Sequence, residues 1–261
     1  MRKLVSVFLL VCGGVFAAPA EIKTADEITY DRLVKMGDDS GSTDHVLHFK
    51  KLFKELDVRT FLEFGVSYAS KYFLDSCDDV ITVEFITYGY GPERIKNFLK
   101  LYENYENWMP VIFFTGYQGD MGWAPYKHRG TEGVYKATSY QSATHQSYAV
   151  FDSFYQTELN LFILKLTQTN PIDVAFINEG IIIRGDLVQL LFGKVPVIFA
   201  HDTSCRAAGN TEDVYGYSRI RVPEDYEEIY FPHGSGTTAW IVKKEPFKNL
   251  ILSLKKYAKG L

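Results

Sequence analysis

"FLEFGVSYASKYFLDSCDDVITVEF" (residues 61–85) indicates a buried strand, a turn of small residues, a helix and a second buried strand that ends in an acid. Glu63 stands at the end of the first strand, and Gly65 permits a tight turn. The start of the following helix offers unpaired N–H groups and a partial positive charge to an anionic ligand. Ser67 stands where such nucleotide-binding turns usually carry a second glycine, so the turn alone also fits an ordinary strand-to-helix connection.

Glu84 closes the second strand, about 20 residues after Gly65, the spacing typical of a ribose-binding acid. A carboxylate at this place can accept hydrogen bonds from both hydroxyls of a ribose. The alternative is a solvated glutamate at a strand end. An acid directly after the apolar "VITV" favours the first interpretation, because ionised carboxylates avoid burial unless they are bonded. The stretch therefore predicts a nucleotide-binding pair formed by Gly65 and Glu84.

The alternation of strands and helices continues outward from this stretch. Apolar runs predict parallel strands over 58–64, 80–85, 110–116, 172–180 and 195–202. Segments of helical spacing lie between them, with one helix opening at Pro92, and "YEEIYFPHGSGTTAWIVKK" predicts a hairpin before a last amphipathic helix. We predict an α/β fold: a doubly wound, Rossmann-like, mostly parallel seven-stranded sheet with an antiparallel C-terminal hairpin. Ligands of such sheets bind beyond the carboxyl ends of the strands.

The N-terminal residues 1–20, "MRKLVSVFLLVCGGVFAAPA", have the basic start, apolar stretch and small-residue end of a secretory signal peptide. The apolar run is short for a membrane span, which needs about 20 residues, so no stable span is expected after cleavage. This predicts a secreted or periplasmic protein. A translation start at Met36 would instead leave a cytoplasmic protein with the whole core intact. Cys77 and Cys205 are expected at opposite ends of the sheet and therefore unbridged, which is unusual for an exported chain.

Residues 21–261 are predicted to form the folded domain, with 117–149 as a long insertion loop and candidate lid. This loop is rich in Gly, Tyr, Ser and Thr and lacks a clear period. The net charge of -4 and the lack of a basic stripe argue against a nucleic-acid partner. His45 and His48 share one helix face and are predicted to be structural. The oligomeric state stays open.

With these residues in place, the chain resembles the class I S-adenosylmethionine-dependent methyltransferases. The resemblance rests on the order and spacing of "FLEFGVSYASKYFL", "VITVEF", "DVAFINEG" and "VPVIFAHDT", and it extends from about Ser42 to Lys244. The nearest type is the small-molecule and sugar-directed group that ends its fifth strand in His-Asp. The resemblance implies S-adenosylmethionine as cofactor and O- or N-methylation of a small-molecule or sugar-like acceptor.

The resemblance also implies roles for individual residues at the strand ends. His201 and Asp202 are the candidate catalytic residues, with a packed ring as the alternative for His201. Asp202, Asn178 and Glu179 are candidate ligands of a divalent cation, for which oxygen donors suit Mg²⁺. Asn178 stands where the family usually has aspartate, which removes a charge, and Asp202 could instead cap the following turn. The implied cofactor-binding residues are Glu63, Gly65, Ser67, Glu84, Gly116, Tyr117, Asp120 and Asn178.

The alternative function comes from another class. The methyl donor is made in the cytosol, whereas the first residues predict export. An exported, catalytically inactive methyltransferase-fold protein that acts as a binding or host-interaction module would resolve this conflict. The weakened glycine turn and Asn178 favour the same alternative. A third possible function is that of a related fold that binds another nucleotide. Direct binding of the methyl donor would discriminate between them.

Overall fold

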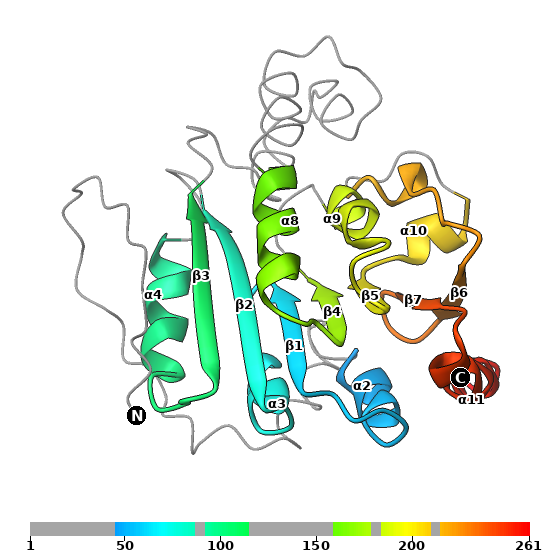
Figure 1. The fold of residues 1–261 in the computed structure, drawn as a ribbon, viewed down its shortest axis with the longest axis horizontal. Helices are drawn as coiled ribbons and strands as arrows, with labels where there is room; N and C mark the ends of the chain where they lie inside the picture. The colour runs from blue at the N-terminus through cyan, green and yellow to red at the C-terminus, as the bar shows by residue number, and fades with distance from the viewer. Residues whose placement is uncertain (1–44, 87–91, 115–158, 179–183, 210–214) are drawn as a thin grey trace, which may run out of the picture.

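One sheet runs through the part of the chain that the structure describes, in the strand order β3-β2-β1-β4-β5-β7-β6 (Figure 1). The computed structural model describes residues 45–86, 92–114, 159–178, 184–209 and 215–261. The strands are β1 (Thr60–Phe64), β2 (Asp79–Ile86), β3 (Trp108–Phe114), β4 (Val174–Ile177), β5 (Val197–His201), β6 (Tyr226–Phe231) and β7 (Thr237–Val242).

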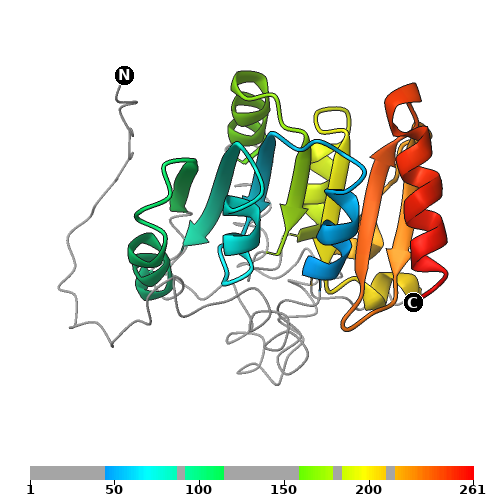
Figure 2. The same cartoon turned by 90° about the horizontal axis from the view of Figure 1, so that it is seen from below.

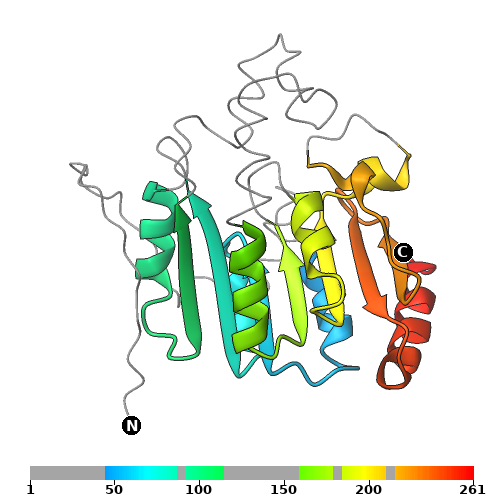
Figure 3. The ribbon, with the colours of Figure 1, turned by 45° about the horizontal axis from the view of Figure 1, so that its top comes forward.

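The first five strands pair in parallel, and β7 pairs antiparallel with both β5 and β6. Figure 3 shows β2, β3 and β4 pointing to one edge of the sheet and β7 pointing the opposite way. The predicted α/β sheet with an antiparallel C-terminal hairpin is therefore confirmed. The short apolar strands β4 and β5 are buried along their whole length, as strands covered on both faces must be.

Two helical layers cover the sheet (Figure 2). The first layer holds α2 (Val46–Leu52), α3 (Ser70–Leu74), α4 (Pro92–Leu101) and α11 (Lys248–Ala258). The second layer holds α8 (Asn160–Thr169), α9 (Arg184–Leu191) and the short helix η4 (Tyr217–Arg219). The remaining short helices are α10 (Ser204–Ala207) and η5 (Glu245–Phe247).

Aromatic rings dominate the core under the first helical layer. Phe49 of α2 contacts Phe61, Phe73, Phe176 and Phe199, with ring centroids 4.8 to 5.5 Å apart. These rings come from α3 and from three different strands. The Phe49 side chain therefore packs α2 against both α3 and the centre of the sheet. Edge-to-face ring pairs, such as those of Phe49 with Phe61 and Phe73, contribute beyond their buried area.

The strand order reverses between β1 and β4, because β1 leads to β2 and β3 on one side while β4 lies on the other. In an open α/β sheet the crevice at the carboxyl ends of such a strand pair is the usual ligand site. The turn after Phe64 and the residue Asn178 both lie at this edge. The fold therefore brings the described strand-end residues that the sequence singled out to one edge of one sheet.

Several sequence predictions fall on elements as expected, and others lie outside the described residues. Helix α4 begins at Pro92, as predicted. Cys77 and Cys205 are free thiols. None of the described helices is long and apolar enough to cross a membrane. The predicted signal peptide (1–20) and insertion loop (117–149) lie outside the described residues.

Candidate functional site

The turn after β1 is built around a glycine that no other residue would replace without strain. Gly65 has φ +93°, in the left-handed region that favours glycine. Its N–H donates to the carbonyl oxygen of Val83 at 2.9 Å, so the turn continues the β1–β2 pairing by one residue. The next N–H, that of Val66, donates to Glu84 Oε2 at 2.9 Å. The bend and Glu84, which lies two residues before the end of β2, therefore face each other in direct contact.

Glu63 contacts the same turn through Ser70 and is fully buried. The Ser70 hydroxyl lies 2.9 and 2.7 Å from its two carboxylate oxygens, and the Thr82 hydroxyl lies 3.2 Å from Oε2. Ser70 Oγ also accepts from the N–H of Ser67 at 2.9 Å. Glu63 and Ser70 thus connect the end of β1 to the start of α3 and hold the turn between them.

Aromatic side chains fix the outer part of the turn. The Tyr102 hydroxyl donates to the carbonyl oxygen of Ser67 at 2.8 Å. The Tyr68 ring is 42% exposed and meets the edge of Phe98, with ring centroids 5.4 Å apart. The Ser67 hydroxyl accepts from the N–H of Ala69 at 3.2 Å. Ser67, which replaces the expected second glycine, is therefore engaged within the turn.

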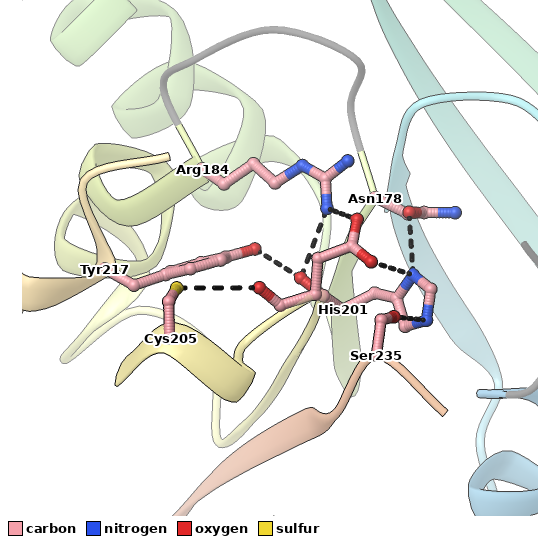
Figure 4. Close-up of polar contacts among 7 residues, drawn as sticks. Asn178, Arg184, His201, Cys205, Tyr217 and Ser235 are labelled. Atoms are coloured by element: carbon pink, nitrogen blue, oxygen red, sulfur yellow. Dashed lines mark hydrogen bonds and ion pairs between the residues drawn. The ribbon is translucent and has the colours of Figure 1, made fainter. Parts of the chain in front are cut away.

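A second polar cluster lies at the ends of β4 and β5 (Figure 4). The His201 ring is buried, with Nδ1 3.3 Å from Asn178 Oδ1 and Nε2 3.0 Å from Ser235 Oγ. An amide oxygen only accepts, so this arrangement suits the tautomer that carries its proton on Nδ1. The same ring packs against His45 of the chain before α2, with centroids 4.8 Å apart. His201 is thus a buried ring whose two nitrogens both face polar groups.

Asp202 follows His201 in a conformation that is rare for a residue with a side chain. Its φ is +60°, in the left-handed region. Its Oδ2 accepts from Arg184 Nη1 at 2.7 Å, and its Oδ1 lies 3.6 Å from His201 Nδ1. Burial works to raise the pKa of Asp202. The charges of Arg184 and His201, together with hydrogen bonds from Ser235 and Arg184, outweigh burial and hold the pKa below its ordinary value.

Arg184 is the central residue of this cluster, although nothing in the sequence singled it out. It is 4% exposed, donates to the carbonyl oxygen of His201 at 3.1 Å and stacks on the Tyr215 ring at 4.0 Å. Burial works to lower the pKa of Arg184, but Tyr215, Tyr217 and the Asp202 carboxylate outweigh it and raise the pKa. The guanidinium therefore stays charged inside the protein, where it is neutralised by Asp202.

The described donors do not fit the magnesium site that the resemblance implies. Asp202 is paired with Arg184, and Asn178 Oδ1 faces His201. Among the described residues, no group of three or more His, Cys, Asp or Glu side chains is placed to hold a metal ion. Glu179 lies outside the described residues.

The structure therefore places the predicted site residues in two clusters at one edge of the sheet. Gly65, Ser67, Glu63 and Glu84 form the first, at β1 and β2. Asn178, His201 and Asp202 form the second, at β4 and β5. The predicted adenine-site residues Gly116, Tyr117 and Asp120 lie outside the described residues. The sequence analysis missed the side chains that hold these clusters, namely Ser70, Thr82, Arg184, Tyr217 and Ser235.

The comparisons with known proteins found similarity among solved structures. No protein-family model and no curated protein matches the sequence. A structure described as a "putative caffeoyl-CoA O-methyltransferase" from Staphylococcus aureus is 13% identical with a TM-score of 0.47, over 83% of this chain and 94% of its own. A methyltransferase from Geobacter sulfurreducens is 9% identical (TM-score 0.40; 82% and 88% covered). An SAH-bound methyltransferase from Podospora anserina is 10% identical (TM-score 0.43; 84% and 85% covered). Identity this low gives no residue of this chain a role.

Proposed function

We propose that this chain is an S-adenosylmethionine-dependent methyltransferase that acts on an oxygen or nitrogen of a small-molecule or sugar-like acceptor. One observation carries the proposal: Glu84 Oε2 accepts from the Val66 N–H at 2.9 Å, across the bend at Gly65. A strand-end carboxylate and a tight glycine turn in contact at a strand-order reversal make the arrangement that a ribose-bearing ligand needs. The motif order in the sequence supplies the cofactor class.

The turn residues would bind and orient the cofactor. The Glu84 carboxylate would accept from the ribose hydroxyls, and the Gly65 turn would leave its backbone open to close approach. Glu63 is enclosed by Ser70 and Thr82, so we assign it the support of the turn in addition to the cofactor role that the resemblance implies. The bound cofactor supplies an electrophilic methyl group. The protein contributes chiefly the alignment of donor and acceptor, which is a proximity effect.

The second cluster would serve the acceptor. His201 is the group that we propose takes the proton from the attacking oxygen or nitrogen, and Ser235 faces its Nε2 at 3.0 Å. Asp202 lies 3.6 Å from His201 Nδ1, on the other ring nitrogen, where a carboxylate stabilises the protonated imidazole. The cluster thus has the base, His201, and the supporting carboxylate, Asp202, that deprotonation of the acceptor requires.

Calorimetric titration of the purified chain with S-adenosylmethionine and S-adenosylhomocysteine tests this proposal. We expect saturable binding at a single site and a loss of at least about tenfold in affinity, equal to about 1.4 kcal/mol, in Glu84→Gln. Asp173→Asn is the matched control. Asp173 also accepts backbone N–H groups at 2.9 Å, from Arg59 and Thr60, but it does so at the opposite edge of the sheet. No saturable binding by the wild-type chain, or equal losses in both variants, would overturn the proposal.

One structural observation favours the second candidate, an exported binding or host-interaction module without catalysis. Both Glu63 and Glu84 are fully buried and bonded within the protein, so each carboxylate already has a structural role. N-terminal sequencing of the mature protein provides the test, because export predicts a chain that begins at Glu21 after removal of residues 1–20. A mature chain from the export compartment that binds no methyl donor would favour this candidate, whereas a product that starts near Met36 would favour the enzyme.

A further inference from the structure

Arg184 pairs its permanent positive charge with the Asp202 carboxylate. A metal ion at this strand end would require the same carboxylate as a ligand. Arg184 Nη1 lies 2.7 Å from Asp202 Oδ2 and 3.1 Å from the carbonyl oxygen of His201. One nitrogen therefore bridges the side chain of Asp202 and the main chain of the residue before it. A cation that approached Asp202 would meet the guanidinium at short range, where like charges repel strongly in a poorly hydrated site.

The backbone contacts of the next residue, Gly185, also hold Arg184 in place. The N–H of Gly185 donates to the carbonyl oxygen of Tyr215 at 2.8 Å. A Cβ at Gly185 would lie 2.2 Å from the carbonyl oxygen of Gly216, so only glycine admits this close approach. The approach places the Tyr215 ring on the guanidinium and lets the Tyr217 hydroxyl donate to the His201 carbonyl at 2.6 Å.

Contacts to the His201 carbonyl and to the Asp202 carboxylate together fix the left-handed backbone of Asp202. The His201 carbonyl accepts from both Arg184 and Tyr217, and the Asp202 carboxylate is paired with the same guanidinium. A backbone conformation of this kind persists only where its surroundings over-determine it. The charge and the geometry of the cluster are therefore set by the protein itself.

We propose that Arg184 is the resident cation of this strand-end site: it positions Asp202 and His201 and keeps a divalent metal ion off the Asp202 carboxylate. The inference concerns metal binding and stands whether or not the chain transfers methyl groups. One part of the inference rests on the proposed function: in methyl transfer, deprotonation of the acceptor depends on side chains of this cluster and not on a cation held by Asp202.

Titration of the full chain with Mn²⁺, followed by the electron paramagnetic resonance signal of the free ion, tests this inference. We expect the wild type and Asp202→Asn to give the same titration. Arg184→Met frees the carboxylate, and we expect it to bind Mn²⁺ at least about tenfold more tightly than the wild type. Arg219→Met is the matched control, since Arg219 makes an ion pair of the same 2.7 Å length with Asp186 on α9, in a more exposed position. It should titrate like the wild type.

Two results would overturn the inference. The first is wild-type binding of Mn²⁺ that weakens about tenfold or more in Asp202→Asn, since even the loss of a residue that only supports a metal ligand costs about this much. The second is a folded Arg184→Met protein with no gain in Mn²⁺ affinity. If Arg184→Met does not fold, the comparison of the wild type with Asp202→Asn decides the question alone. Because the readout is metal binding, its failure is distinguishable from a failure to bind the methyl donor.

Discussion

Ser70 connects more groups than any other small side chain of the turn. Its hydroxyl contacts both oxygens of the buried Glu63 carboxylate and accepts from the Ser67 N–H. Thr82 gives Glu63 its other hydroxyl contact and in turn accepts from Trp108 Nε1 at 2.9 Å. These contacts join β1, β2, β3 and α3. A buried carboxylate is tolerated here because hydroxyl groups take the place of water.

Ser70→Ala should therefore destabilise the protein by about 1–3 kcal/mol, because it leaves the Glu63 carboxylate with one hydroxyl donor fewer. The free energy of unfolding in urea measures this loss. Ser253→Ala is the control, since Ser253 also donates to a glutamate, Glu55, at 3.0 Å, but on the surface. The control should change stability by less than about 0.5 kcal/mol. Equal effects in the two variants would show that burial of the Glu63 pair contributes nothing.

The residues that sequence alone could identify are those whose role follows from position within one strand or turn. Gly65 and Glu84 are of this kind, since each is defined by the end of an apolar run. Arg184 is not, because its partner Asp202 is 18 residues away on another element. Ser235 reaches His201 only because the register pairs His201 with Thr237 across β5 and β7. Such partners are set by tertiary packing, which no local pattern encodes.

Helix α9 and the segment that holds η4 make a close backbone contact beside the second cluster. Gly185 lies at the start of α9, and its missing Cβ leaves room for the carbonyl of Gly216. The contact brings Tyr215 and Tyr217 to Arg184. The strand-end cluster therefore depends on the docking of two elements that are far apart in sequence.

Gly185→Ala should separate these two elements and cost roughly 1–3 kcal/mol of stability, as overpacking of a close contact does. Thermal unfolding measures the cost. A matched control is Gly260→Ala, where the added Cβ would lie 3.4 Å from the Tyr257 carbonyl, an ordinary contact. The control should unfold within the error of the wild type. A Gly185→Ala protein as stable as the wild type would mean that the segment around η4 moves freely aside.

The same division between local and tertiary information holds for whole elements. The fold class could be predicted because alternating apolar runs and helical periods extend along the chain. Element ends were less certain: the strand expected over 172–180 covers Val174–Ile177, and the apolar helical period that begins at Val46 reaches Leu56, whereas α2 ends at Leu52. Phe53 and Leu56 continue the apolar period beyond that helix and pack on the core from a turn instead. Burial, and not helical periodicity alone, accounts for their apolar character.

On the scale of the whole molecule, a buried imidazole makes the stability of the protein sensitive to acid. His45 is fully buried and packs against the rings of Phe176 and His201. Burial, and then the nearby His201, His48 and Arg184, hold the pKa of His45 well below 6.5. The folded state thus keeps His45 neutral, while the unfolded chain takes up a proton below about pH 6.5. The unfolded state binds more protons there, so stability falls as the pH falls.

We expect the free energy of unfolding to decrease by as much as about 1.4 kcal/mol per pH unit between about pH 6.5 and 5 through this one group. His45→Phe should flatten the decrease, whereas His233→Gln should keep it. Urea unfolding across this pH range measures the slope. The depressed pKa of Asp202 adds its own loss only below its ordinary value of 3.8, outside this window. An unchanged slope in His45→Phe would assign the acid sensitivity to other groups.

The late position of β7 in the chain has a consequence for synthesis. The outer edge of β5 is covered by residues 237–242, which leave the ribosome after the other described strands of the sheet. Until then the apolar strand Val197–His201 has one edge whose backbone N–H and C=O groups are not yet paired with β7, and a strand of another nascent copy could pair with them. A message truncated before codon 237 would leave that edge unpaired permanently, so we expect such fragments to accumulate as insoluble material, whereas losses confined to the residues after α11 should be harmless.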